Sequence, residues 1–258
     1  MTNDDGIHAQ GLKTLWKSVH EFADVAIVAP LIEKSGCGLG ITWGKPLRIA
    51  PVEWEGCAKA WSLNGTPADC VKMALSVLLD RRPDLIISGI NRGSNSGRTA
   101  LYSGTVGGVI EGAMKGIPGI AFSFSDYDSN PSADIAKKYI APLIQYFLAH
   151  PLPHETILNV NFPYNCDREI KGVRVAKQGK GHWIEQPDRR IHPEGLPYYW
   201  LGGRWHSDAE EPESDVALLD QGFITAVPLQ VGQLTHPEVY SAHKEALQRQ
   251  FGSHSYQK

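Results

Sequence analysis

Short apolar runs rich in β-branched residues alternate with stretches of helical periodicity through residues 10–150. Leu12, Leu15 and Val19 recur at the spacing of an amphipathic helix, and the run DVAIVAP at residues 24–30 is typical of a buried strand that ends at a proline. A chain that alternates helix and strand in this way folds into a mainly parallel sheet with helices on both faces. The alternation therefore predicts an α/β fold of three layers.

The same pattern continues towards the C-terminus. Thr66 followed by Pro67 predicts a helix start, because threonine caps helices well and proline is favoured at the first helical position. Apolar residues then repeat at helical spacing as far as Leu78. Further strands are expected at residues 84–90, 117–125, 156–163 and 222–230, and further helices at residues 105–116, 132–150 and 237–251.

Residues 178–214 break the alternation. They are rich in glycine, proline, charge and aromatic residues, and they are too polar to form a core of their own, so a hairpin arm is expected. Exposed aromatic residues on an arm mark a subunit contact more often than a base-stacking surface. Five such residues lie here: Trp183, Tyr198, Tyr199, Trp200 and Trp205. They predict at least a homodimer.

These observations favour a single domain. Its α/β core is expected at about residues 1–177 and 215–235, its arm at about residues 178–214, and a C-terminal helix and tail at residues 236–258. A hydrophobic content of 42% in 258 residues supports a sizeable core.

Composition also excludes several classes of protein. A formal net charge of −3 without basic clusters argues against a nucleic-acid polymer or an anionic membrane as partner. No apolar run approaches the roughly 20 residues of a membrane span. The four cysteines, Cys37, Cys57, Cys70 and Cys166, form no C-x-x-C pair, which argues against a zinc site or a disulfide framework. A cytoplasmic location is expected.

Polar loops lie where three of the expected strands end, and such strand ends are where open α/β sheets bind ligands. These loops offer carboxylate, amide and hydroxyl oxygens, the ligands that Mg²⁺ or Mn²⁺ prefers. The residues that provide them are Asp4, Asp5, Ser35, Asn91, Asn95, Ser103 and Thr105. The segment YSGT at residues 102–105 directly precedes a helix, so its backbone N–H groups form a natural anion seat. A metal beside an anion seat indicates phosphoryl chemistry.

Two segments match known nucleotide-binding motifs only in part. The segment SGCGLGI has Ile41 where the third glycine of a dinucleotide fingerprint belongs. The segment NRGSNSGRT resembles a P-loop, but Arg92 replaces its first glycine and Arg98 its lysine. A Rossmann oxidoreductase and a triphosphate site are therefore disfavoured.

Six segments in order along the chain resemble the SurE family of survival-protein phosphatases. They are TNDDGIHAQGL, VAPLIEKSG, NGTPADCVKMAL, PDLIISGINRGSNSG with LYSGTVGGVIEG, LNVNFP and GFITAVPLQ. The resemblance implies a Rossmann-like core with a C-terminal extension used in oligomerisation, as a homodimer or a dimer of dimers. It also implies a metal-dependent nucleotidase that acts on nucleoside 5′-monophosphates, with 3′-monophosphates and short polyphosphate as further substrates in some members.

The matched motifs also imply roles for single residues. The metal ligands would be Asp4, Asp5, Ser35 and Asn91. The substrate phosphate would face Asn95, Ser103, Gly104 and Thr105. Asp4 and Asp5, with Asn95, Ser103 and Thr105, would form the catalytic set. One departure stands out, because only Met1, Thr2 and Asn3 precede Asp4 where the family carries an apolar strand. The central strand is therefore expected to be absent or very short.

Structural alternatives remain open for these residues. Ser35 and Asn91 could be turn residues that bond their own backbone, and Ser103 and Thr105 could be plain helix caps. The alternative function is a non-catalytic nucleotide-binding or phosphate-binding protein whose metal site is impaired by the short N-terminus. The sequence ranks neither the bases, nor 5′ against 3′ esters, nor the two metals.

Overall fold

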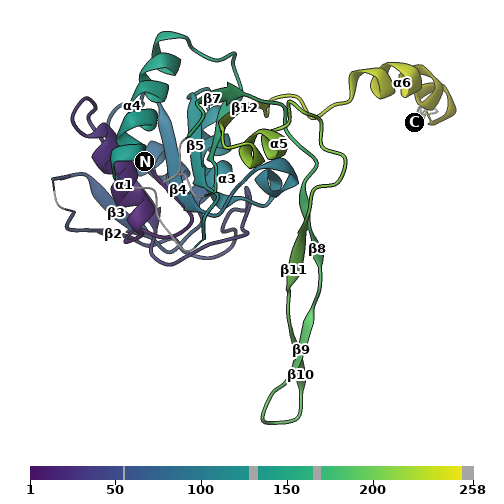
Figure 1. The fold of residues 1–258 in the computed structure, drawn as a ribbon, viewed down its shortest axis with the longest axis horizontal. Coiled ribbons are helices and arrows are strands. Elements are labelled where there is room, and N and C mark those ends of the chain that lie inside the picture. Colours follow the sequence, from purple (N-terminus) through teal and green to yellow (C-terminus); the bar gives the residue numbers. More distant parts are fainter. Residues whose placement is uncertain (55, 128–132, 165–169, 252–258) are drawn as a thin grey trace, which may run out of the picture.

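The structure is a computed structural model that describes residues 1–54, 56–127, 133–164 and 170–251 (Figure 1). Its centre is a five-stranded sheet in the order β4-β5-β6-β12-β7. β4 (Ile86–Arg92), β5 (Gly119–Phe124) and β6 (Thr156–Phe162) are parallel. β12 (Ile224–Gln230) runs antiparallel to β6, and β7 (Val173–Val175) is parallel to β12. The expected mainly parallel sheet is confirmed.

Helices cover both faces of this sheet. On one face, α1 (Gln10–Val19) and α4 (Ala133–Ala149) pack over a core that includes Leu15, Phe122 and Phe162. On the other face lie α2 (Pro67–Met73) and α3 (Gly104–Ala113), whose apolar residues pack against the same strands. Cysteine 166 lies outside the described residues.

The expected start of α2 is confirmed in detail. The Thr66 hydroxyl accepts a hydrogen bond from the Asp69 backbone N–H at 3.2 Å, and the Asp69 carboxylate accepts one from the Thr66 N–H at 2.9 Å. This reciprocal pair satisfies two N–H groups that a helix start leaves free. After Met73 the helix widens into a π turn over Ala74–Leu78.

A second sheet joins the first through the first residues of the chain. It contains β1 (Ile27–Pro30), β3 (Ala60–Leu63) and β2 (Ile49–Pro51), in the order β1-β3-β2. The Val28 N–H donates to the Met1 carbonyl at 2.9 Å, and Thr2 forms a parallel bridge with Ser88 of β4. The central strand is thus very short, as expected, yet it still places Asp4 at the carboxyl ends of β1 and β4.

An apolar cavity of about 380 Å³ lies where a longer strand would continue beyond Met1 between β1 and β4. Side chains from α1, α2 and α4 line it, among them Val19, Val71 and Ile144. The Met1 amine lies at its edge and donates to the Ala26 carbonyl at 2.6 Å. Burial lowers the pKa of this amine to about 6.

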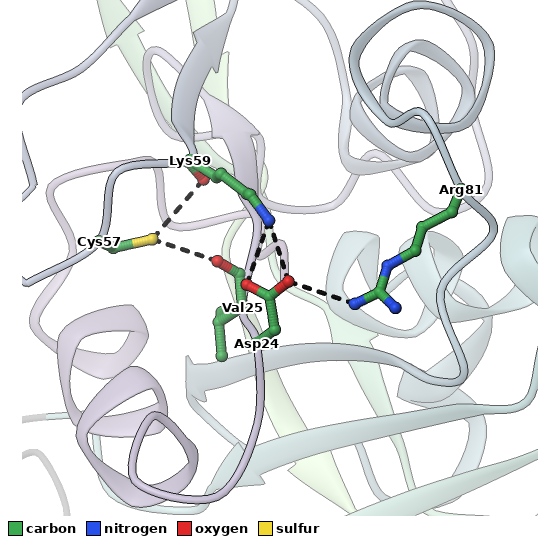
Figure 2. A network of polar contacts seen from close by, with 5 residues as sticks. All are labelled: Asp24, Val25, Cys57, Lys59 and Arg81. Carbon is green, nitrogen blue, oxygen red and sulfur yellow. Dashed lines mark hydrogen bonds and ion pairs between the residues drawn. The ribbon is translucent and has the colours of Figure 1, made fainter.

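A polar network lies at the rim of this cavity (Figure 2). The Asp24 carboxylate pairs with the Lys59 ammonium at 2.9 Å and with the Arg81 guanidinium at 3.3 Å. The Cys57 thiol donates to the Val25 carbonyl at 3.3 Å. Because the three charged side chains are exposed, the ion pairs add little stability.

The predicted hairpin arm extends away from the body of the molecule (Figure 1). Near its base β8 (His182–Glu185) pairs with β11 (Gly203–His206), and further out β9 (Asp188–Ile191) pairs with β10 (Pro197–Trp200). All five aromatic side chains predicted to mark a contact are at least 36% exposed. Exposed aromatic side chains that gather on one segment are typical of an interaction surface.

The chain returns to the body through α5 (Asp215–Asp220) and ends, among the described residues, in α6 (Pro237–Phe251). α6 stands apart from the core and has no buried residue (Figure 1). None of the helices in the described ranges has both the length and the apolar character needed to cross a bilayer.

Candidate active site

The predicted site residues come from three loops at one edge of the joined sheets. Asp4 and Asp5 follow the short pairing of residues 1–3, and Ser35 lies in the loop after β1. Residues 91–105 span the end of β4, the connection of residues 93–103 and the start of α3. The Lys34 N–H donates to the Asp4 carbonyl at 2.7 Å, which joins the first two loops. The Arg92 N–H donates to the Asp5 carboxylate at 3.3 Å, which joins the first to the third.

Asp4 lies against the N-terminus of α3. Its carboxylate accepts a hydrogen bond from the Thr105 hydroxyl, and the backbone of Gly104 and Thr105 also donates to it. A Cβ atom added to Gly104 would lie 2.8 Å from the Asp4 Cβ and 2.6 Å from the Cys37 Sγ, so only glycine permits this approach. Burial raises the pKa of Asp4, although these hydrogen bonds oppose the shift.

Asp5 is half-buried beside Asp4. Burial raises its pKa to about 6, and the Asp4 charge adds to the rise, while the Arg92 N–H and guanidinium oppose it. Burial and mutual repulsion thus disfavour the charged forms of these two adjacent carboxylates. A bound cation would stabilise both charges.

The side chains of Asn91 and Ser35 make hydrogen bonds to groups other than Asp4 and Asp5. The Asn91 side-chain N–H donates to the Gly93 carbonyl at 2.8 Å, which holds the amide nitrogen on the backbone and leaves the amide oxygen as the group suited to a cation. The exposed Ser35 hydroxyl donates to the Glu33 carboxylate at 2.6 Å. Glu33 also raises the pKa of Asp5, so a third acid contributes to the field here. Sequence reasoning missed Glu33, although its place two residues before Ser35 could have indicated it.

The predicted phosphate-facing residues make mostly internal contacts. The Ser103 hydroxyl accepts from the Val106 N–H at 3.1 Å and caps α3, as the structural alternative predicted. Thr105 is fully buried and faces Asp4. The Asn95 side chain donates to the Ser123 hydroxyl at 2.7 Å, and its backbone N–H donates to Asn161 at 2.8 Å. The structure thus brings Gly104 and Thr105 to the acid pair and turns the Asn95 side chain towards β5.

Comparison with known proteins identifies the family. The model of the family described as "Survival protein SurE" matches residues 1–185 of the chain. The chain belongs to the SurE family. It is 50% identical over 238 residues to a protein named 5′-nucleotidase SurE from Protochlamydia amoebophila. The aligned region covers 92% of this chain and 91% of that protein. It is 43% identical over 230 residues to a protein of the same name from Moorella thermoacetica, which covers 89% and 88%.

A solved SurE structure has the same fold. The crystal structure of the SurE protein from Aquifex aeolicus superposes with a TM-score of 0.81 at 34% identity, covering 95% of this chain and 97% of that one. Because the match spans nearly the full length, the arm and the C-terminal region belong to a shared architecture together with the α/β core.

The donor set of this SurE chain fits a hard divalent cation. In the described part of the chain, three or more His, Cys, Asp or Glu side chains nowhere cluster so that they alone could hold a metal. The acid pair is instead accompanied by amide and hydroxyl oxygens, and Mg²⁺ and Mn²⁺ accept such mixed sets with water completing the shell. Burial raises the pKa of both Asp4 and Asp5, and the Asp4 charge adds to the rise at Asp5.

Proposed function

We propose that this SurE chain hydrolyses nucleoside 5′-monophosphates to nucleoside and phosphate at the loop cluster around Asp4 and Asp5. The reaction class rests on family membership: the chain is a 5′-nucleotidase of the SurE family. The contact of the Asp4 carboxylate with the N-terminus of α3 supports this location, because the acid pair then lies beside the positive end of a helix dipole.

The metal would be held by Asp4, Asp5, Ser35 and Asn91. When bound, a divalent cation supplies positive charge for the phosphoryl group and lowers the pKa of a water molecule. The protein contributes the two carboxylates at fixed positions, because Thr105 orients Asp4 and the Arg92 backbone orients Asp5.

The substrate phosphate would lie at the start of α3, near Ser103, Gly104 and Thr105, with Asn95 on the preceding loop. The positive end of the helix dipole favours an anion here. The Gly104 and Thr105 N–H groups donate to the Asp4 carboxylate and the Val106 N–H donates to Ser103, so the helix would act on the phosphate mainly through this dipole. The proton of the Thr105 hydroxyl points at the Asp4 carboxylate, so Thr105 acts on the phosphate through the acid it orients. Asn95 acts through the loop that its backbone contacts fix.

A panel of substrates tests this function. Phosphate release is measured from 5′-AMP, 5′-GMP, 5′-CMP, 5′-UMP, 3′-AMP and tripolyphosphate, first in EDTA and then with added Mn²⁺ or Mg²⁺. We expect release only with metal, fastest from 5′-monophosphates. Nucleotide binding without phosphate release under every metal condition would support the non-catalytic alternative.

We further propose that the arm packs against a second copy of the chain, giving a homodimer or a dimer of dimers. The exposed aromatic residues at the arm tip support this, because large aromatic side chains are enriched where protein interfaces form.

The three described cysteines are free thiols, which supports the expected reducing, cytoplasmic location.

A further inference from the structure

The loop between β4 and α3 is fastened to the base of the hairpin arm. The Arg98 N–H donates to the Gly181 carbonyl at 2.8 Å, and the Gln178 side chain donates to the Gly97 carbonyl at 2.9 Å. Gly97 has a φ of +56°, and a Cβ atom there would lie 2.5 Å from the Gly181 oxygen. The loop backbone therefore meets the arm backbone at a distance that only glycine allows.

Asp215 lies at the centre of this junction. It is fully buried, at the point where the chain returns from the arm. One carboxylate oxygen accepts from the Gly97 N–H at 3.0 Å. The other accepts from the Gly179 N–H at 2.7 Å and from the Val216 N–H at 2.9 Å. One side chain thus binds the active-site loop, the segment that enters the arm before β8 and the helix after the arm.

The backbone of Asp215 strengthens the same junction. Its N–H donates to the Lys177 carbonyl at 2.8 Å, beside the parallel bridge between Lys177 and Ser214. The two chain segments that enter and leave the arm are therefore tied together at the point where the carboxylate reaches Gly97. Because three backbone N–H groups donate to one buried carboxylate, the attachment is firm.

The loop held in this way carries the residues assigned to the substrate phosphate. Gly97 lies two residues after Asn95 and six before Ser103. On the sheet side the same loop is held by Asn161 and Asn159, which bond the Asn95 N–H and carbonyl, each at 2.8 Å. On the arm side it is held by Asp215.

We propose that Asp215 is a positioning residue of the nucleotidase site, which sets the place of the loop from Asn95 to Ser103 relative to the base of the arm. The proposal rests on the phosphate site assigned above. Through this carboxylate the geometry at the phosphate and the attachment of the arm are fixed together. A displacement of about 1 Å in such a loop can lower the rate by up to about 100-fold.

The test is Asp215→Asn, which keeps the shape of the side chain but replaces one accepting oxygen with an NH₂ group that cannot accept. We expect the KM for 5′-AMP to rise about tenfold while the Mn²⁺ concentration for half-maximal activity stays unchanged, because Asp4 and Asp5 do not contact Asp215. The matched control is Asp220→Asn at the exposed end of the same helix, with unchanged KM.

A general loosening of the fold would change KM and metal activation together, in step with the melting temperature, and that result would overturn the proposal. So would an unchanged KM in D215N. Gln178→Ala provides the second variant, because Gln178 is exposed and holds the same residue, Gly97. If D215N does not fold, Q178A decides. A raised KM in Q178A supports the proposal that the contacts to Gly97 position the loop, and an unchanged KM overturns that proposal.

Thr105→Ala separates this proposal from the site assignment on which it rests, since Thr105 orients Asp4 at the assigned phosphate position. If T105A raises KM and D215N does not, the phosphate site stands and the role of Asp215 is wrong. If neither variant changes KM, the phosphate site itself is wrong and the role of Asp215 falls with it.

Discussion

The Thr105 hydroxyl donates a hydrogen bond to the Asp4 carboxylate across 101 positions of sequence. The contact fixes the orientation of the more buried acid of the pair, and it links the start of the chain to the first turn of α3. The anion seat and the acid pair are consequently one structural unit.

Asp4→Asn should remove most of the activity. The substitution keeps the size of the side chain but removes its negative charge, so we expect kcat to fall by roughly 10² or more. Steady-state phosphate release with Mn²⁺ measures the loss, and the melting temperature checks that the fold is kept. Asp80→Asn, at an exposed position, is the control and should keep full activity. A fully active D4N would remove Asp4 from the site.

Thr105→Ala should have a milder effect than Asp4→Asn. The variant leaves the Asp4 charge in place but removes the hydroxyl that orients it. We expect a smaller loss of activity, seen more in KM than in kcat. Both parameters come from initial rates over a range of nucleotide concentrations. A loss in kcat as large as that of D4N would mean that Thr105 itself acts on the reacting phosphoryl group.

The stability of the metal-free protein should fall as the pH rises from about 4 to about 6. Burial and the Asp4 charge raise the pKa of Asp5 from 3.8 to about 6, so between these values the folded state binds more protons than the unfolded state. Stability therefore decreases with pH in this window. Urea unfolding in EDTA at several pH values measures the decrease.

Asp5→Asn should make this pH dependence shallower, because the substituted side chain does not titrate. Asp4, whose pKa is also raised, retains part of the effect. Equal slopes for the wild type and D5N would contradict the assignment to Asp5.

An apolar extension at the N-terminus should stabilise the protein. Placing Lys-Ile-Leu-Leu before Met1 would fill the apolar cavity of about 380 Å³ and pair with the free edges of β1 and β4. Each added backbone hydrogen bond contributes roughly 0.5–1.5 kcal/mol, and apolar burial adds to this. We expect a higher melting temperature and higher activity.

The matched control is Lys-Gln-Asn-Asn, which has the same length without the apolar side chains. Identical melting temperatures and identical rates of phosphate release in the two extended proteins would show that no strand enters the cavity.

Shortening the arm should lower the oligomeric mass before it harms the core. Replacing residues 187–202 by Asn-Gly removes β9 and β10 with three of the exposed aromatic residues and keeps the β8–β11 pair. Light scattering at micromolar concentration should show an oligomer for the intact protein and a smaller species for the shortened one. A monomeric intact protein would contradict the proposed interface.

No covalent phosphoenzyme should accumulate during turnover. Asp4 is held by Thr105 and the α3 backbone, and Asp5 by the Arg92 N–H, which suits charge stabilisation better than nucleophilic attack. Acid quench of a single turnover with ³²P-labelled nucleotide and excess enzyme tests this. Radiolabel bound to the precipitated protein would establish an aspartyl-phosphate intermediate.

The fold was largely predictable because local signals agree with tertiary structure. The helix start at Thr66 and the apolar runs of β4, β5 and β6 lie where residue patterns place them. The antiparallel direction of β12 was not predictable, because its apolar run reads the same in either direction.

The types of residue that form the site could be predicted from the sequence, but the contacts between them could not. Residue types at strand ends indicated Asp4 and Asp5, whereas the contact of Thr105 with Asp4 depends on how closely Gly104 lets α3 approach. The supporting residues Asn159 and Asn161 were missed. They lie within an apolar strand, and the sequence of that strand does not indicate which distant loop their side chains bond.

The contacts that assemble the site join residues far apart in the sequence. Thr2 pairs with Ser88, and Asp4 meets Thr105 across 101 positions, whereas Met1 already meets Ala26 and Val28. Contacts so distant in sequence are expected to form late in folding, because closing long loops costs entropy before any contact repays it. We therefore expect the acid pair to reach its place against α3 after the local helices and strands have formed, so that phosphate release returns later in refolding than secondary structure does.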